Sequence, residues 1–290
     1  MSGDEAQREP RQSLPAAQSL EEVSLRADVS GTLQRACAAN RELSYIGVSG
    51  DGDSLSIGLG QLCHAIRRNL DMLYVLENNG VYGLTKGQFS ASADVGSRAK
   101  RGEANRQRPI DPVLLALTLG ASFVARGFSG DKEQLVPLLK AGLAHRGFAL
   151  VDVISPCVTF NDHEGSTKSY LSTRQRHHDV APVDFVPMTR EITGSYAEGA
   201  GLAVRMHDGS MVRFRKVGSD YDPTDREGAY RHVQELQERG EVVTGLLFVE
   251  PGSEDLHQMS QTVERPLVSL PFEELCPGST ALDELMQELA

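Results

Sequence analysis

The sequence lacks several features that mark special classes of protein. Its 290 residues include no tryptophan and only four cysteines, and no two cysteines are spaced as Cys-x-x-Cys. This scarcity argues against a disulfide framework and against a zinc site, and it fits a reducing compartment. The amino terminus has no signal-peptide pattern and no apolar run reaches about 18 residues, so we expect a cytoplasmic protein without a membrane partner.

An excess of positive charge is absent as well. Lysine and arginine together number 29, against 40 for aspartate and glutamate, which gives a net charge of −11. Since contact with nucleic-acid phosphates needs a basic face, we expect no nucleic-acid partner. Hydrophobic residues make up 40% and charged residues 24% of the chain, which is the balance of an ordinary globular protein.

Strand-like and helix-like segments alternate through residues 31–160. The patterns predict strands at 44–49, 72–76, 122–127 and 148–154, and helices at 57–69, 111–119 and 131–145. This alternation predicts an α/β fold with a doubly wound, mostly parallel sheet. Residues 1–30 are rich in polar residues, and we expect a disordered leader there.

Residues 161–290 follow a different pattern and form a predicted C-terminal extension. Asp208-Gly209 lies between two strand-like segments and predicts a β-hairpin. Thr224 and Glu227 have the spacing of a capping box and predict the start of a helix. The chain is therefore expected to contain one α/β domain, at 31–160, followed by this extension.

Polar residues follow two consecutive predicted strands. Gly50-Asp51-Gly52 comes after the first strand and Asn78-Asn79 after the second, with 25 residues between the two motifs. The carboxyl ends of parallel strands meet at the edge where such sheets bind ligands. Carboxylate and amide oxygens suit Mg²⁺, which is often bound together with phosphates. Glycines without a Cβ let a diphosphate approach the backbone, and the amides that open the next helix favour it. Two unrelated turns are the alternative interpretation.

These motifs resemble the diphosphate-binding motif of thiamine-diphosphate enzymes. Four longer stretches, GDGDSLSIG, HAIRRN, NNGVYGLTKGQ and ISPCVTFNDHEGSTKSY, resemble the β subunit of 2-oxoacid:ferredoxin oxidoreductases. VDFVP, DYDPTDR and VTGLLFV in the C-terminal part are similar to the same subfamily, so the likeness runs from about residue 31 to the C-terminus.

The resemblance implies a site for thiamine diphosphate and Mg²⁺. It makes Asp51, Asn79 and the carbonyl of Val81 the Mg²⁺ ligands. The residues that it places around the diphosphate are Gly50, Gly52, Asp53, Gly83, Leu84 and Thr85. Lys86 is implied near the reacting end of the cofactor, where it helps to hold the substrate or coenzyme A; a solvated lysine is the alternative.

The resemblance also implies an activity and its partners. The expected reaction is oxidative decarboxylation of a 2-oxoacid, of the 2-oxoglutarate or pyruvate type, to an acyl-coenzyme A, with electrons passing through a [4Fe-4S] cluster to ferredoxin. The implied partners are the α subunit of the same oxidoreductase, the 2-oxoacid, coenzyme A and ferredoxin. Cys157, in ISPCVTFND, matches one of the ligands of the cluster.

The sequence departs from the family in one respect. The family's Cys-Pro-Gly-Cys motif, its third cysteine and its His-Gly-Arg stretch are not found, so the chain resembles a family member without roughly its first 70 residues. A [4Fe-4S] cluster usually has four thiolate ligands, and Cys157 supplies one. Two alternatives therefore stay open, a cofactor-binding subunit without turnover and a non-oxidative thiamine-diphosphate decarboxylase. The contexts of Cys157 and Lys86 argue against the second.

Overall fold

The computed structural model describes residues 29–82, 87–97, 104–155, 192–205, 211–276 and 278–289. The predicted leader, apart from its last two residues, lies outside these ranges. The strands are β1 (Tyr45–Gly50), β2 (Met72–Asn78), β3 (Phe123–Phe128), β4 (Phe148–Ile154), β5 (Gly201–Arg205), β6 (Met211–Lys216) and β7 (Glu241–Val249). The helices are α1 (Val29–Ala39), the π-helical turn η1 (Asp53–Ile57), α2 (Leu59–Arg67), α3 (Pro112–Leu119), α4 (Lys132–Ala144), α6 (Arg226–Glu238), α7 (Leu256–Met259), the 3₁₀ turn η2 (Leu267–Ser269), α8 (Phe272–Leu275) and α9 (Gly278–Glu288).

The strands form one seven-stranded sheet in the order β1-β2-β4-β3-β7-β6-β5. Strands β1, β2, β4 and β3 are parallel neighbours, and β7 runs antiparallel to β3. The hairpin of β5 and β6 continues the sheet because β6 pairs with β7 in parallel. The predicted α/β fold with a mostly parallel sheet and a hairpin in the extension is confirmed.

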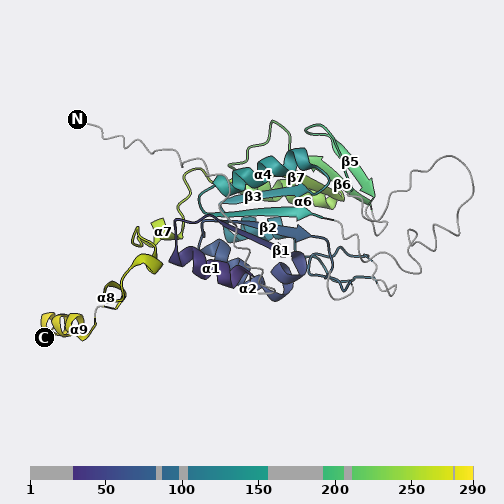
Figure 1. Ribbon diagram of the computed structural model, residues 1–290. Coiled ribbons are helices and arrows are strands. Elements are labelled where there is room, and N and C mark those ends of the chain that lie inside the picture. Colours follow the sequence, from purple (N-terminus) through teal and green to yellow (C-terminus); the bar gives the residue numbers. More distant parts are fainter. Residues whose placement is uncertain are drawn as a thin grey trace, which may run out of the picture.

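Helices cover both faces of this sheet (Figure 1). On one face, α1, α2, α3 and α6 pack over a core that includes Tyr74, Phe148 and Leu247. On the other face, α4 packs over a smaller core that includes Leu73 and Phe123. Strands β3 and β4 are buried along almost their whole length, because parallel strands between two helical layers have no wet face.

Two predicted helix starts need correction. The helix expected at 57–69 begins earlier, because helical turns follow β1 directly and lead through η1 into α2. The residue that caps α6 is Asp225, whose carboxylate accepts from the backbone N–H of Gly228 at 2.9 Å, so the predicted cap at Thr224 is wrong. The Thr224 hydroxyl instead donates to Asp222, 2.7 Å away, and a carboxylate is the stronger acceptor for a helix amide.

The C-terminal segment extends away from the sheet (Figure 1). Helices α8 and α9 expose large apolar side chains, among them Phe272, Leu282 and Met286. In the described part of the chain, no helix is both long enough and apolar enough to cross a membrane.

Candidate functional site

The candidate site lies at the carboxyl ends of β1 and β2. Asp51 follows the last residue of β1, and Asn79 follows the last residue of β2. The two strands are parallel and in register, with Gly50 opposite Glu77. The fold therefore brings the two predicted motifs to one edge of the sheet, where Asp51 lies 2.9 Å from the backbone nitrogen of Gly80.

Asp51 is the most constrained side chain of this edge. It is fully buried, and its Oδ2 accepts hydrogen bonds from the Gly80 N–H and from the hydroxyls of Ser90 and Ser92. The other carboxylate oxygen, Oδ1, is also buried but has no hydrogen-bond partner among the described residues. A buried carboxylate oxygen without a donor is costly, so this atom marks a position that suits a cation.

The loop after β2 is folded tightly around Asn79 and Val81. Asn79 Oδ1 accepts from the Val81 N–H at 2.9 Å, and Val81 forms an isolated antiparallel bridge with Phe89. Between them, Gly80 has a φ of +76°, which side chains rarely tolerate. This left-handed residue turns its N–H toward Asp51, so the tight turn and the carboxylate depend on each other.

The two glycines of the first motif have different surroundings. A Cβ on Gly50 would meet nothing within 4 Å, so the backbone there is open to a ligand. A Cβ on Gly52 would lie 2.5 Å from the Tyr82 ring, so packing within the chain already requires this glycine. Asp53 is half-buried at the start of η1. Approach of a diphosphate to these residues stays a prediction.

Five predicted site residues lie outside the described part of the chain. They are Gly83, Leu84, Thr85, Lys86 and Cys157. The last described residue before Cys157 is Ser155, next to the end of β4, and it donates its backbone N–H to the Asn78 carbonyl at 2.9 Å. The last described residue before the other four is Tyr82, in the loop after β2.

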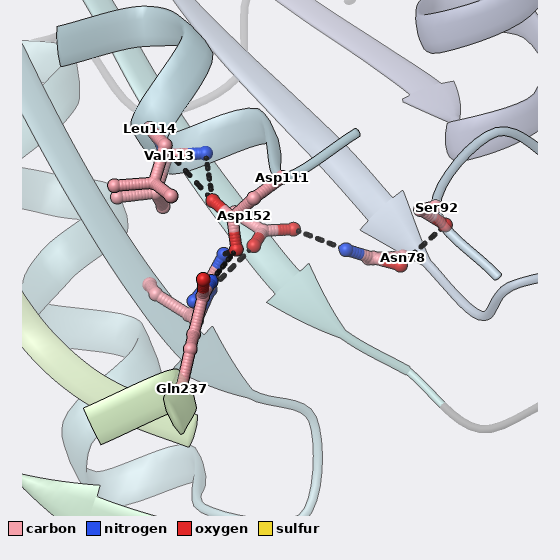
Figure 2. Close-up of polar contacts among 8 residues, drawn as sticks. Asn78, Ser92, Asp111, Val113, Leu114, Asp152 and Gln237 are labelled. Carbon is pink, nitrogen blue, oxygen red and sulfur yellow. Dashed lines mark hydrogen bonds and ion pairs between the residues drawn. The ribbon is translucent and has the colours of Figure 1, made fainter. Parts of the chain in front are cut away.

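A buried ion-pair network adjoins the site, and sequence analysis missed it (Figure 2). Arg126 on β3 donates from Nε to Asp152 on β4 at 2.6 Å and from Nη2 to Asp111 at 2.7 Å. Asp111 also caps α3 by accepting from the backbone N–H groups of Val113 and Leu114. The available signals were an arginine and an aspartate inside otherwise apolar strands, which imply that the two charges are paired.

The network holds its charges in a medium that disfavours them. Burial raises the pKa of Asp152 to about 6, against the opposing effect of the Arg126 guanidinium. Burial alone would lower the pKa of Arg126, but the carboxylates of Asp111 and Asp152 raise it above its usual value. Arg126 is therefore a permanent cation between two acids.

The network reaches the candidate site through one amide. Asn78 Nδ2 donates to Asp152 Oδ1 at 3.1 Å, and Asn78 Oδ1 lies 3.0 Å from the Ser92 hydroxyl (Figure 2). Ser92 in turn contacts Asp51 Oδ2. The interior ion pair and the candidate cation ligand are thus parts of one continuous chain of polar contacts.

The described cysteines do not gather. Cys37, Cys63 and Cys276 are free and lie on α1, on α2 and next to α8. Burial raises the pKa of the Cys37 thiol to about 12, which disfavours the thiolate that iron requires. Among the described residues, no group of three or more His, Cys, Asp or Glu side chains is arranged to hold a metal.

The chemistry of the donor set fits a Mg²⁺-bound diphosphate. Mg²⁺ binds one or two carboxylates together with phosphate oxygens and waters, so it does not need a cluster of acids. The site offers one buried carboxylate oxygen at Asp51, an amide side chain at Asn79, and an open backbone at Gly50.

Comparison with known proteins finds a thiamine pyrophosphate-binding family and several related subunits. Residues 30–153 match the family described as thiamine pyrophosphate enzyme, C-terminal TPP binding domain; thiamine pyrophosphate is another name for thiamine diphosphate. The 2-oxoacid:ferredoxin oxidoreductase subunit beta of Saccharolobus solfataricus is 42% identical over 145 residues, which are 50% of this chain and 47% of the relative. The 2-oxoglutarate oxidoreductase subunit KorB of Mycobacterium tuberculosis is 45% identical over 125 residues, covering 43% and 34% of the two chains.

A solved structure is similar over most of the chain. It is a 2-oxoglutarate:ferredoxin oxidoreductase from Magnetococcus marinus with 2-oxoglutarate, coenzyme A and succinyl-CoA bound, and the match has a TM-score of 0.62 and 26% identity. It covers 89% of this chain and 73% of that one. The chain spans about half the length of the S. solfataricus relative and about a third of that from M. tuberculosis. Residues 30–153 of this chain are therefore similar to the thiamine pyrophosphate-binding domain of thiamine pyrophosphate enzymes, and the chain resembles the β subunits of 2-oxoacid:ferredoxin oxidoreductases.

Proposed function

We propose that the chain works as the β subunit of a 2-oxoacid:ferredoxin oxidoreductase and binds thiamine diphosphate with Mg²⁺. The proposed reaction is the oxidative decarboxylation of a 2-oxoacid to an acyl-coenzyme A, with electrons passing to ferredoxin, and it takes place in the cytoplasm together with an α subunit. The observation that carries the proposal is the buried, unpartnered Oδ1 of Asp51 at the sheet edge. The Magnetococcus marinus structure favours 2-oxoglutarate over pyruvate as the substrate.

We assign one set of residues to the cation and another to the diphosphate. Asp51 offers Oδ1 to the cation while three donors hold its Oδ2, and Asn79 and the Val81 carbonyl complete the protein ligands. Gly50, Gly52, Asp53, Gly83, Leu84 and Thr85 are proposed to surround the diphosphate. The bound cofactor supplies the electron sink for the decarboxylation, and the protein supplies orientation and electrostatics.

Two residues beyond the described ranges complete the proposal. Lys86 is proposed to lie beside the reacting end of the cofactor, where its charge attracts the carboxylate of the 2-oxoacid or coenzyme A phosphates. Cys157 is proposed as one ligand of an Fe-S cluster that needs further thiolates from outside the described residues. Both belong to segments that follow strands ending at the site edge.

The test is calorimetric titration of thiamine diphosphate into the full chain, with whatever α subunit co-purifies, in Mg²⁺ and in EDTA. We expect binding in Mg²⁺ and none in EDTA. Asp51→Asn should weaken binding by at least about 100-fold, which is the upper range for residues that only support metal ligands. Because the amide can still accept from Gly80, Ser90 and Ser92, the folded state should persist by circular dichroism. The control is Asp283→Asn, an exposed acid on α9, which should bind as the wild type does. Unchanged binding by Asp51→Asn would contradict the proposal.

One observation favours a second candidate, a cofactor-binding subunit that lacks a cluster. The described cysteines are scattered, and the Cys37 thiol is held in its protonated form. The two candidates differ in visible absorbance: a purified protein with the broad band of a [4Fe-4S] cluster, which is lost in Cys157→Ala, supports the first. A protein that binds thiamine diphosphate but is colourless after anaerobic purification supports the second.

A further inference from the structure

The Asp51 carboxylate is held from one side only. Three donors converge on Oδ2, namely the Gly80 N–H and the hydroxyls of Ser90 and Ser92, and Oδ1 is left without a partner among the described residues. The side chain cannot rotate without breaking these three hydrogen bonds. Hydrogen bonds to a charged group are stronger than those between neutral groups, so the orientation of the carboxylate is firmly set.

Ser92 depends in turn on Asn78. The Ser92 hydroxyl lies 3.0 Å from Asn78 Oδ1 and also contacts Asp51 Oδ2, so its single proton is shared between two acceptors. The Asn78 amide has only one possible orientation, because its other end faces the carboxylate of Asp152 at 3.1 Å and must therefore be the NH₂ group. Asn78 Oδ1 then necessarily faces Ser92.

Asp152 anchors this arrangement in the interior. It is fully buried, and Arg126, itself 3% exposed, donates to it at 2.6 Å. The same guanidinium reaches Asp111 at the start of α3. Asp152 therefore holds the amide that faces Ser92, and Arg126 acts on that amide only through Asp152.

We propose that Ser92 and Asn78 are positioning residues for the cation site, and that they hold Asp51 in the orientation that leaves Oδ1 free for a divalent cation. The inference rests on the proposed function, since it assigns these two residues to the Mg²⁺-diphosphate site. It adds that the affinity of the site depends on a hydroxyl and an amide that do not touch the cation. Removal of a residue that orients a metal ligand typically weakens metal binding by roughly 10- to 100-fold.

The experiment is a titration of the full chain, with any co-purifying α subunit, with Mn²⁺ as a paramagnetic probe. Free Mn²⁺ is measured by electron paramagnetic resonance in the presence of thiamine diphosphate. Ser92→Ala should raise the Mn²⁺ dissociation constant roughly tenfold or more, and Asn78→Leu should do the same. Ser92→Thr keeps the hydroxyl and should restore affinity to within about threefold of the wild type, a difference under 1 kcal/mol.

The matched control is Ser122→Ala. Ser122 is also a serine with a hydrogen-bonded hydroxyl, although it is fully buried whereas Ser92 is half-buried. It lies at the opposite end of the strands, where its hydroxyl donates to Asn69 at 2.7 Å. This variant should lower the thermal midpoint and leave the Mn²⁺ dissociation constant unchanged. If Ser122→Ala weakens Mn²⁺ binding as much as Ser92→Ala does, the effect is one of general stability and the inference is overturned.

The remaining outcomes separate this inference from the proposed function. Wild-type protein that binds Mn²⁺ and thiamine diphosphate, together with a Ser92→Ala variant that binds equally well, would overturn the positioning role and leave the function standing. Equal losses in Ser92→Ala and Ser92→Thr would show that the shape of the side chain matters rather than its hydroxyl, and would also overturn it. Wild-type protein that binds neither probe would overturn both.

Discussion

The two ends of the central strands carry polar networks of opposite character. At the amino end, Asn69 uses its whole side chain: Nδ2 donates to the Ser253 hydroxyl and the Glu254 carbonyl, and Oδ1 accepts from the Ser122 hydroxyl and the Phe148 N–H. At the carboxyl end, Asp51 has three donors on one oxygen and none, among the described residues, on the other.

This difference in hydrogen-bond pairing indicates which end of the strands binds a ligand. A buried polar network whose atoms all have partners adds stability and specifies one arrangement. A buried carboxylate oxygen without a donor lowers stability, and natural proteins keep such atoms mainly where something binds. The polar network at the amino end therefore stabilises the fold, and the one at the carboxyl end has the features of a ligand-binding site. Three variants test this division, beginning with the largest expected effect.

Removal of the buried Arg126 charge should cause the largest loss in the free energy of unfolding. Arg126→Met leaves the buried carboxylates of Asp111 and Asp152 without their partner, and breaking a buried ion pair in this way costs about 3–5 kcal/mol. The measurement is the free energy of unfolding from urea titration of the cofactor-free chain. As a control, Arg215→Met breaks a partly exposed pair with Glu241 and should cost about 0–1 kcal/mol. If the two variants lose the same free energy of unfolding, burial does not make the Arg126 ion pairs more important for stability than an exposed pair.

An intermediate effect is expected at the amino end. Asn69 has a φ of +47°, so Asn69→Gly keeps the left-handed backbone and removes only the amide. The loss leaves the buried Phe148 N–H without its acceptor and should cost about 1–3 kcal/mol of unfolding free energy. The Mn²⁺ dissociation constant should stay at the wild-type value. A weaker Mn²⁺ affinity in this variant would show that the two ends are coupled and would break the comparison.

The smallest effect is a pH dependence at the amino end. Burial lowers the pKa of His145 below its ordinary value of 6.5. The neutral ring fits its contact, because the Ser122 proton goes to Asn69 and His145 Nε2 then donates to Ser122 at 2.8 Å. Below pH 6.5 the unfolded chain binds this proton more readily than the folded chain does, so stability falls as the pH falls until the folded histidine is also protonated.

His145→Gln should reduce this part of the pH dependence, measured as the unfolding free energy between pH 8 and pH 5. The pKa of His232 on α6 is also lowered by burial, so this residue makes a separate contribution and His232→Gln is the matched variant. Each substitution should remove only the part of the pH dependence of the unfolding free energy that its own histidine contributes. An unchanged pH profile in His145→Gln would contradict the assignment.

Much of the architecture could be predicted from local sequence. The apolar runs of β2 and β4 are continuous because both faces of these strands are covered, and such runs are readable without tertiary information. The placement of Asp51 and Asn79 at one edge followed from the strand–helix–strand order alone. The cap of α6 was misplaced by one residue because Thr224 and Asp225 are both good caps, and only the structure shows that the Thr224 hydroxyl is occupied.

The hydrogen-bond partners of some site and strand-end residues could not be predicted from the sequence. Ser90 and Ser92 belong to a long polar stretch without periodicity, so nothing in the sequence pairs them with Asp51. Asn69 is an ordinary residue at the end of a helix until its left-handed backbone turns its amide toward Ser122. Such pairings depend on residues that are far apart in the chain, and no local pattern encodes them.

The sequence by itself determined the strands of the α/β domain, their mostly parallel arrangement and the edge at which the two motifs meet, because apolar periodicity and the positions of glycine act over a few neighbouring residues. Only the tertiary structure decided which oxygen of Asp51 is held and which is left for a ligand. That choice arises where β1, β2, β4 and the loop carrying Ser92 pack together, and the directions of hydrogen bonds are set only when those elements are in contact.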